Sequence, residues 1–356
     1  MASVNILKFG VSSPADTSPL KLLNHAGYHA SDILGVVGKS EGVASVNRAP
    51  TIITNLTGNG CVNDFSRTLS TTVWEPLIPE SAVTIFSGGT EGVLSPHVTF
   101  LVKDTKPTGL IAAVGHTRDF EPHEIGSAAQ AEAVAASITS LLQASSIPQS
   151  QVQMVLIKCP LLTSAKVEAI KAASKTPITT DTYQSMAKSR YASAIGIAVA
   201  LGELPGSELE SVMENETSWS KRASCSSGAE LEDCHILILA SAPDPEGPLR
   251  AVSGYMDDAI DAPAILKCLT QVKQESGEVV QVFAKAEADP RGLIRGKRHT
   301  MNTDSDIHST RHARAAVGGL IAGLVGDPEI YVSGGAEGQG PAGGGPLCMI
   351  YRVPSV

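Results

Sequence analysis

The chain has 356 residues, a formal net charge of −9, and 42% hydrophobic against 18% charged residues. This composition is typical of a globular protein with a substantial core, and the length allows two or three domains. The acidic balance argues against nucleic acid and anionic membranes as partners, no apolar run could span a bilayer, and the N-terminus lacks a signal-peptide pattern. Six cysteines without paired or metal-finger spacing indicate reduced thiols in a cytoplasmic protein.

The first predicted unit, unit A, covers residues 1–105. It opens with the strand NILKFG and the helical segment PLKLLNHAG, and an apolar strand then ends at Lys39. The segment FSRTLST contains Arg67, and the strand SAVTIF leads into SGGTEG, which begins at Ser87. A second apolar strand, HVTFLV, closes the unit.

Unit B, residues 109–247, repeats this order. Residues 128–144 carry apolar side chains at helical period, and the strand VQMVLIK then ends at Lys158. Arg190 lies in KSRYASA, and SSGAE begins at Ser226 before the strand HILILA.

Unit C, residues 249–356, has LRAVSG, then APAILKCLTQ, then a strand ending at Lys285. SGGAEG begins at Ser333 and precedes the strand CMIYRV. Arg311 and Arg314 both lie in the intervening stretch STRHARA, and alignment of the repeats favours Arg311.

The recurring order predicts an α/β (α+β) fold in which a β-α-β-α-β-β unit occurs three times in the chain. The boundaries between units are expected near 105–109 and 245–250. Lysine, arginine and serine recur at corresponding element ends. Closure around a pseudo-threefold axis would bring the three sets to one centre. Such a basic pocket suits a small, planar, oxygen-rich ligand, because arginine offers a fixed fork of N–H donors and Ser-Gly elements offer hydroxyl and backbone N–H groups. A desolvated lysine beside a serine can also act as a base.

Three longer segments resemble the ring-opening amidohydrolases, a family whose members act on cyanuric acid or barbituric acid. They are SGGTEGVLSPH (87–97), RHTMNTDSDIHSTRHARA (298–315) and SGGAEGQGPAGGGP (333–346). The resemblance covers the whole chain. It implies three units around a pseudo-threefold axis, an inner β-barrel-like core with helices outside, and a homotetramer.

The resemblance also implies a site in which Ser226 is the nucleophile and Lys158 its base. A weak argument from the residues agrees, because Lys39 and Lys285 each stand two positions before a glutamate, Glu41 and Glu287, whereas Lys158 does not. The expected substrate-binding residues are Lys39, Arg67, Ser87, Gly88, Arg190, Ser227, Lys285, Arg311, Ser333 and Gly334.

No cofactor is expected for catalysis. The family resemblance implies a structural Mg²⁺ or Ca²⁺ in unit C, since one carboxylate and several carbonyl oxygens suit a hard cation, and the alternative is a glycine-rich loop with no ion. The matching positions are Glu287, Ala336, Gln339, Gly340, Pro341 and Gly344. One departure from the family pattern is an apparent insertion at 43–58, which either loops outward or displaces the binding groups of unit A.

The leading hypothesis is hydrolysis of cyanuric acid to carboxybiuret, which then gives biuret and CO₂. Barbiturate-ring hydrolysis is the close alternative, and a non-catalytic small-metabolite binding protein is a weaker one, since binding alone would not need three Ser–Lys pairs. Two further segments contain residues that could bind a metal or act as acids. His116, His123 and Glu124 favour a loop over a metal site, because no third ligand has fitting spacing. Asp304 and Asp306 are expected to cap and orient the helix that carries Arg311.

Overall fold

The computed structural model describes residues 2–40, 66–243 and 246–354. The apparent insertion at 43–58 and the Glu41 side chain lie outside the described residues.

Unit A forms one four-stranded sheet in the order β3-β2-β4-β1. The pair β2–β3, which includes the edge strand β3, is parallel, and the two other pairs are antiparallel. The elements are β1 (Ala2–Gly10), α1 (Pro19–His25), β2 (Ile33–Ser40), α2 (Ser66–Trp74), β3 (Val83–Gly88) and β4 (His97–Lys103).

Units B and C repeat this strand order as β7-β6-β8-β5 and β13-β10-β14-β9. Unit B has β5 (Leu110–His116), α3 (Ala128–Ala144), β6 (Val152–Pro160), α4 (Ser164–Ala172), α5 (Thr182–Ala200), α6 (Leu209–Asn215), β7 (Ala223–Gly228) and β8 (His235–Ser241). Unit C has β9 (Leu249–Met256), α7 (Ala262–Gln274), β10 (Glu278–Ala286), β11 (Leu293–Ile294), β12 (Lys297–Arg298), α8 (Ser309–Val325), β13 (Tyr331–Gly334) and β14 (Gly345–Arg352). The predicted β-α-β-α-β-β repeat is confirmed, and the segments not predicted are α4, α6 and the β11–β12 hairpin.

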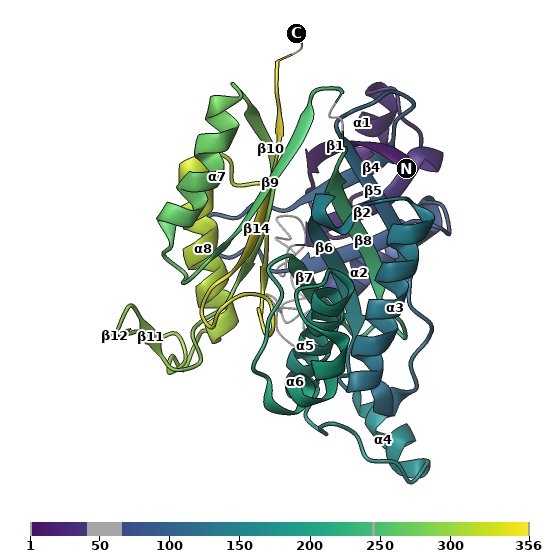
Figure 1. The fold of residues 1–356 in the computed structure, drawn as a ribbon, viewed down its shortest axis with the longest axis vertical. Helices are drawn as coiled ribbons and strands as arrows, with labels where there is room; N and C mark the ends of the chain where they lie inside the picture. The colour runs from purple at the N-terminus through teal and green to yellow at the C-terminus, as the bar shows by residue number, and fades with distance from the viewer. Residues whose placement is uncertain (1, 41–65, 244–245, 355–356) are drawn as a thin grey trace, which may run out of the picture.

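The inner strands β4, β6 and β8 bury both faces, which explains why they read as nearly continuous apolar runs. In β8, Leu237 and Leu239 face a core shared by all three units, whereas Ile236 and Ile238 face the helices of unit B. The shared core draws side chains from the strands of every unit, from Val4 and Ile85 through Leu156 to Ile350. Figure 1 shows the strands inside, with α7 and α8 on one outer flank and α3 on the opposite one.

Backbone pairing between strands joins the sheets of units A and B, but within the described residues no such pairing joins unit C to either of them. Strands β1 and β5 pair at Ala2–Ala112 and Ser3–Ile111, which produces one eight-stranded sheet beside the four-stranded sheet of unit C. Packing of the shared core therefore closes the barrel-like centre between unit C and the other two units in the described part of the chain.

Side chains that accept hydrogen bonds from the first backbone N–H groups mark where some of the helices begin. Asp181 accepts a hydrogen bond from the backbone of Gln184 and so starts α5. Asp304 and Asp306 were expected to cap and orient α8. Neither is the N-cap, which is His308. Asp304 instead orients the helix from the side, through a 2.9 Å contact with Nε2 of His312. Across the described helices, none is both long and apolar enough to cross a membrane.

Candidate active site

The three lysines and three serines are direct partners across parallel strands. In the register of each sheet, Lys39 lies opposite Ser87, Lys158 opposite Ser226 and Lys285 opposite Ser333. Parallel strands end at the same sheet edge, so each pair projects from equivalent places in its unit. All six side chains are buried.

Each lysine also reaches into a neighbouring unit. Its Nζ donates to the carbonyl of the residue that precedes the serine of that unit. The contacts are Lys39 to Val332 at 2.8 Å, Lys158 to Phe86 at 2.5 Å, and Lys285 to Cys225 at 2.7 Å. This cyclic pattern relates the three units by a pseudo-threefold axis and gathers the Ser–Lys pairs around it.

The serines differ in how firmly their hydroxyls are held. Ser333 accepts from Lys285 Nζ at 3.0 Å, Ser87 from Lys39 Nζ at 3.5 Å, and the Ser87 and Ser333 oxygens lie 3.4 Å apart.

Ser226 Oγ is buried and makes no hydrogen bond of ordinary geometry with the described residues. The hydroxyl of Tyr331, whose pKa burial raises to about 12, lies close to all three serines. Of the three serine hydroxyls, that of Ser226 is therefore the one held least by hydrogen bonds.

Arginines from two units form ion pairs with the unit that follows. Arg190 donates Nε and Nη2 to the Glu337 carboxylate, both at 2.7 Å, and Arg314 makes the same two-point contact with Glu91. Burial alone would lower the pKa of Arg190, but the Glu337 carboxylate raises it further than burial lowers it. Arg314 lies close against Gly334, where a Cβ would be 2.3 Å from Nη1 of Arg314, so a side chain at this position would displace the guanidinium.

The third arginine is bound differently. Arg67 Nη1 donates to the carbonyl of Ser227 at 3.0 Å. Glu230, in the position equivalent to Glu91 and Glu337, lies 3.5 Å from Lys158 Nζ. Burial would raise the pKa of Glu230, but the charges of Lys158 and Arg67 lower it overall. The Glu230 carboxylate thus interacts electrostatically with the lysine of its own unit and with Arg67 of unit A.

A pocket opens where the three units meet. Its lining residues are Arg67, Ser87, Gly88, Tyr183, Met186, Arg190, Ser226, Ser227, Thr310, Arg314, Ser333 and Gly334.

Most of the predicted binding residues line this pocket, and the three lysines lie behind their serines. Arg311 is the exception: the arginine of unit C at the pocket wall is Arg314. The two residues lie about one helical turn apart on α8, and counting separations between repeats does not distinguish them.

Lys158 and Lys285 have lowered pKa values because they are buried. Burial lowers the pKa of Lys158 to about 8, although Glu230 opposes the shift. Burial and then the charge of Arg190 lower the pKa of Lys285 to about 7. The argument that Lys158 is distinguished by lacking a carboxylate neighbour is therefore wrong, because Glu230 reaches it from the following strand–loop junction.

Sequence reasoning missed two groups of residues. The glutamates Glu91, Glu230 and Glu337 received no role, although each stands four positions after its serine in all three motifs. The wall residues Tyr183, Met186 and Thr310 were also missed. Placing Arg190 on a helix would have drawn attention to Met186 and Tyr183, which lie about one and two turns before it.

The residues predicted to hold a cation surround the turn after Ser333. The carboxylate of Glu287 is largely buried and accepts from the backbone N–H of Gly343 at 3.3 Å. Burial, with the nearby Glu337 carboxylate, raises the pKa of Glu287 to about 7. The side chain of Gln339 is already engaged, since its Oε1 accepts from the backbone of Cys225. Gln339 and Gly344 donate backbone hydrogen bonds to the carbonyls of Ala336 and Pro341, and Gly340 has a positive φ. A buried carboxylate beside a second one, in a turn rich in carbonyl oxygens, fits a hard cation.

The fold and site together define a threefold-repeat α/β protein with a buried, basic Ser–Lys–Arg pocket on its pseudo-symmetry axis. The family model described as amidohydrolase ring-opening protein matches residues 5–352. The chain belongs to this family, and it is a hydrolase.

Relatives with assigned names are similar over their whole length. The chain is 62% identical over 355 residues to a cyanuric acid amidohydrolase from Sarocladium sp, with 99% of each chain covered. It is 52% identical over 360 residues to a cyanuric acid amidohydrolase from Pseudonocardia dioxanivorans, with 100% of each covered. A solved cyanuric acid hydrolase matches with a TM-score of 0.88 at 39% identity, covering 99% of this chain and 100% of the other. The crystal structure of the enzyme from A. caulinodans matches with a TM-score of 0.88 at 38% identity and the same coverage.

Proposed function

We propose that this protein hydrolyses cyanuric acid, opening its ring to carboxybiuret. The observation that carries the proposal is the threefold set of Lys–Ser register pairs around one pocket, with an arginine from each unit in its wall. Cyanuric acid is a planar ring with three carbonyl groups in threefold arrangement. The names of the relatives at 62% and 52% identity support the same substrate.

Binding would use the three arginines and the Ser-Gly elements as donors to the ring oxygens. The pairing of Arg190 with Glu337, and of Arg314 with Glu91, fixes the guanidinium planes before the substrate arrives. Fixed donors cost little reorganisation when charge develops on a carbonyl oxygen. The glutamates therefore act as positioning residues for the substrate-binding arginines.

In the first chemical step, Ser226 Oγ attacks a ring carbonyl carbon while the uncharged amine of Lys158 takes the hydroxyl proton. The tetrahedral intermediate then collapses with cleavage of the ring C–N bond, and the leaving nitrogen takes the proton from Lys158. The product of this step is an open chain attached to Ser226 as an acyl ester. The pKa of Lys158, lowered by burial to about 8, supports its role as the base.

In the second step, water attacks the ester carbonyl and passes a proton to Lys158. Collapse of this intermediate returns the proton to Ser226 and releases carboxybiuret, so that one water is consumed per ring. Carboxybiuret is a carbamic acid and loses CO₂ to give biuret.

The choice of Ser226 rests on a contrast among the three serines. Ser87 and Ser333 are bound to a lysine and lie within hydrogen-bond distance of each other, which suits substrate binding. The Ser226 hydroxyl makes no such hydrogen bond with the described residues, so it is available to attack.

A structural Mg²⁺ or Ca²⁺ in unit C is a second part of the proposal. Glu287 would supply the carboxylate, and backbone carbonyls of the turn after Ser333 would supply further oxygens, at Ala336, Gln339, Gly340, Pro341 and Gly344. The ion would neutralise the adjoining carboxylates and fix the turn that carries Glu337, the partner of Arg190. We also expect a homotetramer, which light scattering on the purified protein tests.

The deciding experiment incubates the purified protein separately with cyanuric acid and barbituric acid. Ring loss and biuret formation are followed by liquid chromatography. Biuret from cyanuric acid, with little turnover of barbituric acid, is the expected result. Preferential turnover of barbituric acid would mean that barbituric acid, and not cyanuric acid, is the substrate. Tight binding of either ring without any product would overturn the hydrolase mechanism.

A further inference from the structure

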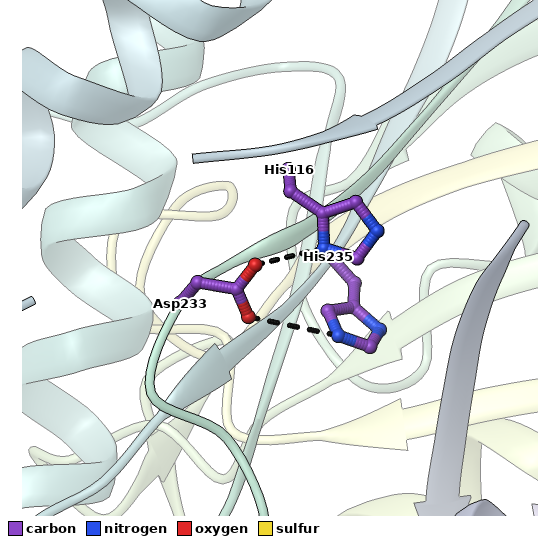
Figure 2. A group of neighbouring side chains, drawn as sticks. All are labelled: His116, Asp233 and His235. Atoms are coloured by element: carbon purple, nitrogen blue, oxygen red, sulfur yellow. Dashed lines mark hydrogen bonds and ion pairs between the residues drawn. The ribbon is translucent and has the colours of Figure 1, made fainter. Parts of the chain in front are cut away.

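Two histidines and an aspartate meet outside the pocket, at the edge of the unit B sheet (Figure 2). His116 ends β5 and His235 begins β8, and the two are direct partners in the antiparallel register. Asp233 stands two residues before His235. Its carboxylate faces both rings, with Oδ2 at 2.8 Å from Nδ1 of His116 and Oδ1 at 3.6 Å from Nε2 of His235.

The position of the proton on His235 follows from its other nitrogen. Nδ1 of His235 lies 3.2 Å from the backbone carbonyl of Thr84, which can only accept a hydrogen bond. The Thr84 hydroxyl, 3.5 Å from the same nitrogen, donates to Glu75 and so can only accept from the ring. Nδ1 therefore carries the hydrogen, and in the neutral ring Nε2 is a bare lone pair.

This tautomer leaves two acceptors facing each other. The Nε2 lone pair of His235 points toward the Asp233 carboxylate at 3.6 Å with no proton between them. Burial lowers the pKa of His235, although the Asp233 carboxylate opposes the shift. Two facing acceptors repel unless a cation lies between them. The Thr84 carbonyl holds the ring in the way that second-shell partners hold metal-binding histidines.

The surroundings also favour a cation. Asp233 forms its ion pairs within the described chain with the two histidines alone. Glu75 lies nearby, and its pKa is raised by partial burial and by the carboxylates of Glu230 and Asp233. His116 is exposed, so ions and water reach the group from outside.

We propose that His116, Asp233 and His235 form a binding site for one divalent transition-metal ion of the Zn²⁺ type. The three candidate ligand atoms lie within 4.8 Å of one another, and two imidazole nitrogens with one carboxylate oxygen are a donor set that Zn²⁺ prefers. The ion replaces the proton between His116 Nδ1 and Asp233, binds Nε2 of His235, and completes a tetrahedral shell with water. This site is separate from the oxygen-rich turn of unit C, and no catalytic step is assigned to it.

The test is a metal titration of full-length, metal-stripped protein in excess Mg²⁺, which saturates a hard-cation site. Zn²⁺ affinity is measured by competition with a chromophoric chelator, and Co²⁺ serves as a spectroscopic probe of tetrahedral geometry. The expected result is one tight ion per chain and the intense visible bands of tetrahedral Co²⁺. His116→Ala and Asp233→Asn should each weaken Zn²⁺ binding at least about tenfold.

The matched control is His123→Ala, which removes a partly exposed histidine on the loop that follows β5. It should leave the affinity unchanged. Circular dichroism establishes that the variants are folded, and since His116 is exposed, its replacement should be tolerated. Absence of a tight ion in the wild-type protein, or wild-type affinity in His116→Ala, would overturn the proposal. Neither result depends on the substrate of the enzyme.

Discussion

Nζ of Lys158 lies 3.5 Å from Oε1 of Glu230, and both side chains are almost completely buried. Burial disfavours the charged lysine, while the carboxylate favours it. The first effect is larger, since the pKa of Lys158 falls to about 8. A base that is partly uncharged near neutral pH is suited to accept a proton from a serine hydroxyl.

Replacing Glu230 by Gln should move the acid limb of the pH–rate profile to lower pH. The acid limb reports loss of the uncharged base as pH falls through the pKa of Lys158. Because Glu230 raises that pKa, removing its charge lowers it, and the base stays uncharged in more acidic solution. The measurement is kcat/KM for cyanuric acid across pH for the wild type and the variant.

The control for this shift is Glu232→Gln, two residues further along. Glu232 is exposed and pairs with Lys166, away from Lys158. Ionisation of the substrate contributes equally to all three profiles. An unchanged acid limb in Glu230→Gln would mean that Lys158 is not the group whose protonation limits the reaction.

The three serines should respond differently to removal of the hydroxyl. Ser226→Ala should lower kcat by about 10⁴-fold or more, as for other serine nucleophiles, while binding of cyanuric acid measured by calorimetry persists. Ser87→Ala and Ser333→Ala remove hydroxyls at equivalent register positions. They should mainly raise KM, because those oxygens are proposed to bind the ring. Turnover near the wild-type rate by Ser226→Ala would exclude it as the nucleophile.

Arg314 and Arg311 form a matched pair on one helix. Arg314→Lys should lower kcat/KM by about 10- to 100-fold, equivalent to about 1.5–3 kcal/mol for lost hydrogen bonds to a charged group. Lysine cannot reproduce the two-point contact with Glu91. Arg311→Lys should have a much smaller effect, since Arg311 is not part of the pocket wall. Equal losses in the two variants would contradict the assignment of Arg314.

The sequence contained enough information for the repeat and the Ser–Lys pairs. Strands buried on both faces give long apolar runs, and β2, β6 and β10 each carry their lysine at or near the strand end. A lysine and a serine at the ends of neighbouring parallel strands must lie side by side, which the register bears out.

Contacts between segments far apart in the sequence were harder to predict. The pairing of Arg190 with Glu337 spans 147 residues, and that of His116 with Asp233 spans 117. Neither follows from local periodicity, because each depends on how one unit or strand is placed against another. The choice between Arg311 and Arg314 was difficult for a different reason, since residues about one helical turn apart have nearly the same sequence context and only the fold places Arg314 in the pocket wall.

Removal of a hard cation from the turn after Ser333 should destabilise the fold. If Mg²⁺ or Ca²⁺ binds at Glu287, adding the ion to chelated protein at about 100 times its Kd should stabilise the fold by about 2.7 kcal/mol. The measurement is thermal unfolding with EDTA, with Mg²⁺ and with Ca²⁺. Glu287→Gln should remove the ion-dependent increase in melting temperature, because its buried carboxylate is the proposed charged ligand.

Glu278→Gln supplies a control in the same strand, since Glu278 is the exposed first residue of β10. Its melting temperature should respond to the ion as the wild type does. An ion effect of equal size in Glu287→Gln would place the cation elsewhere, and no ion effect in the wild type would leave the turn as a glycine-rich loop without an ion. Because Glu337 lies in this turn and holds Arg190, loss of the cation should also raise KM more than it lowers kcat.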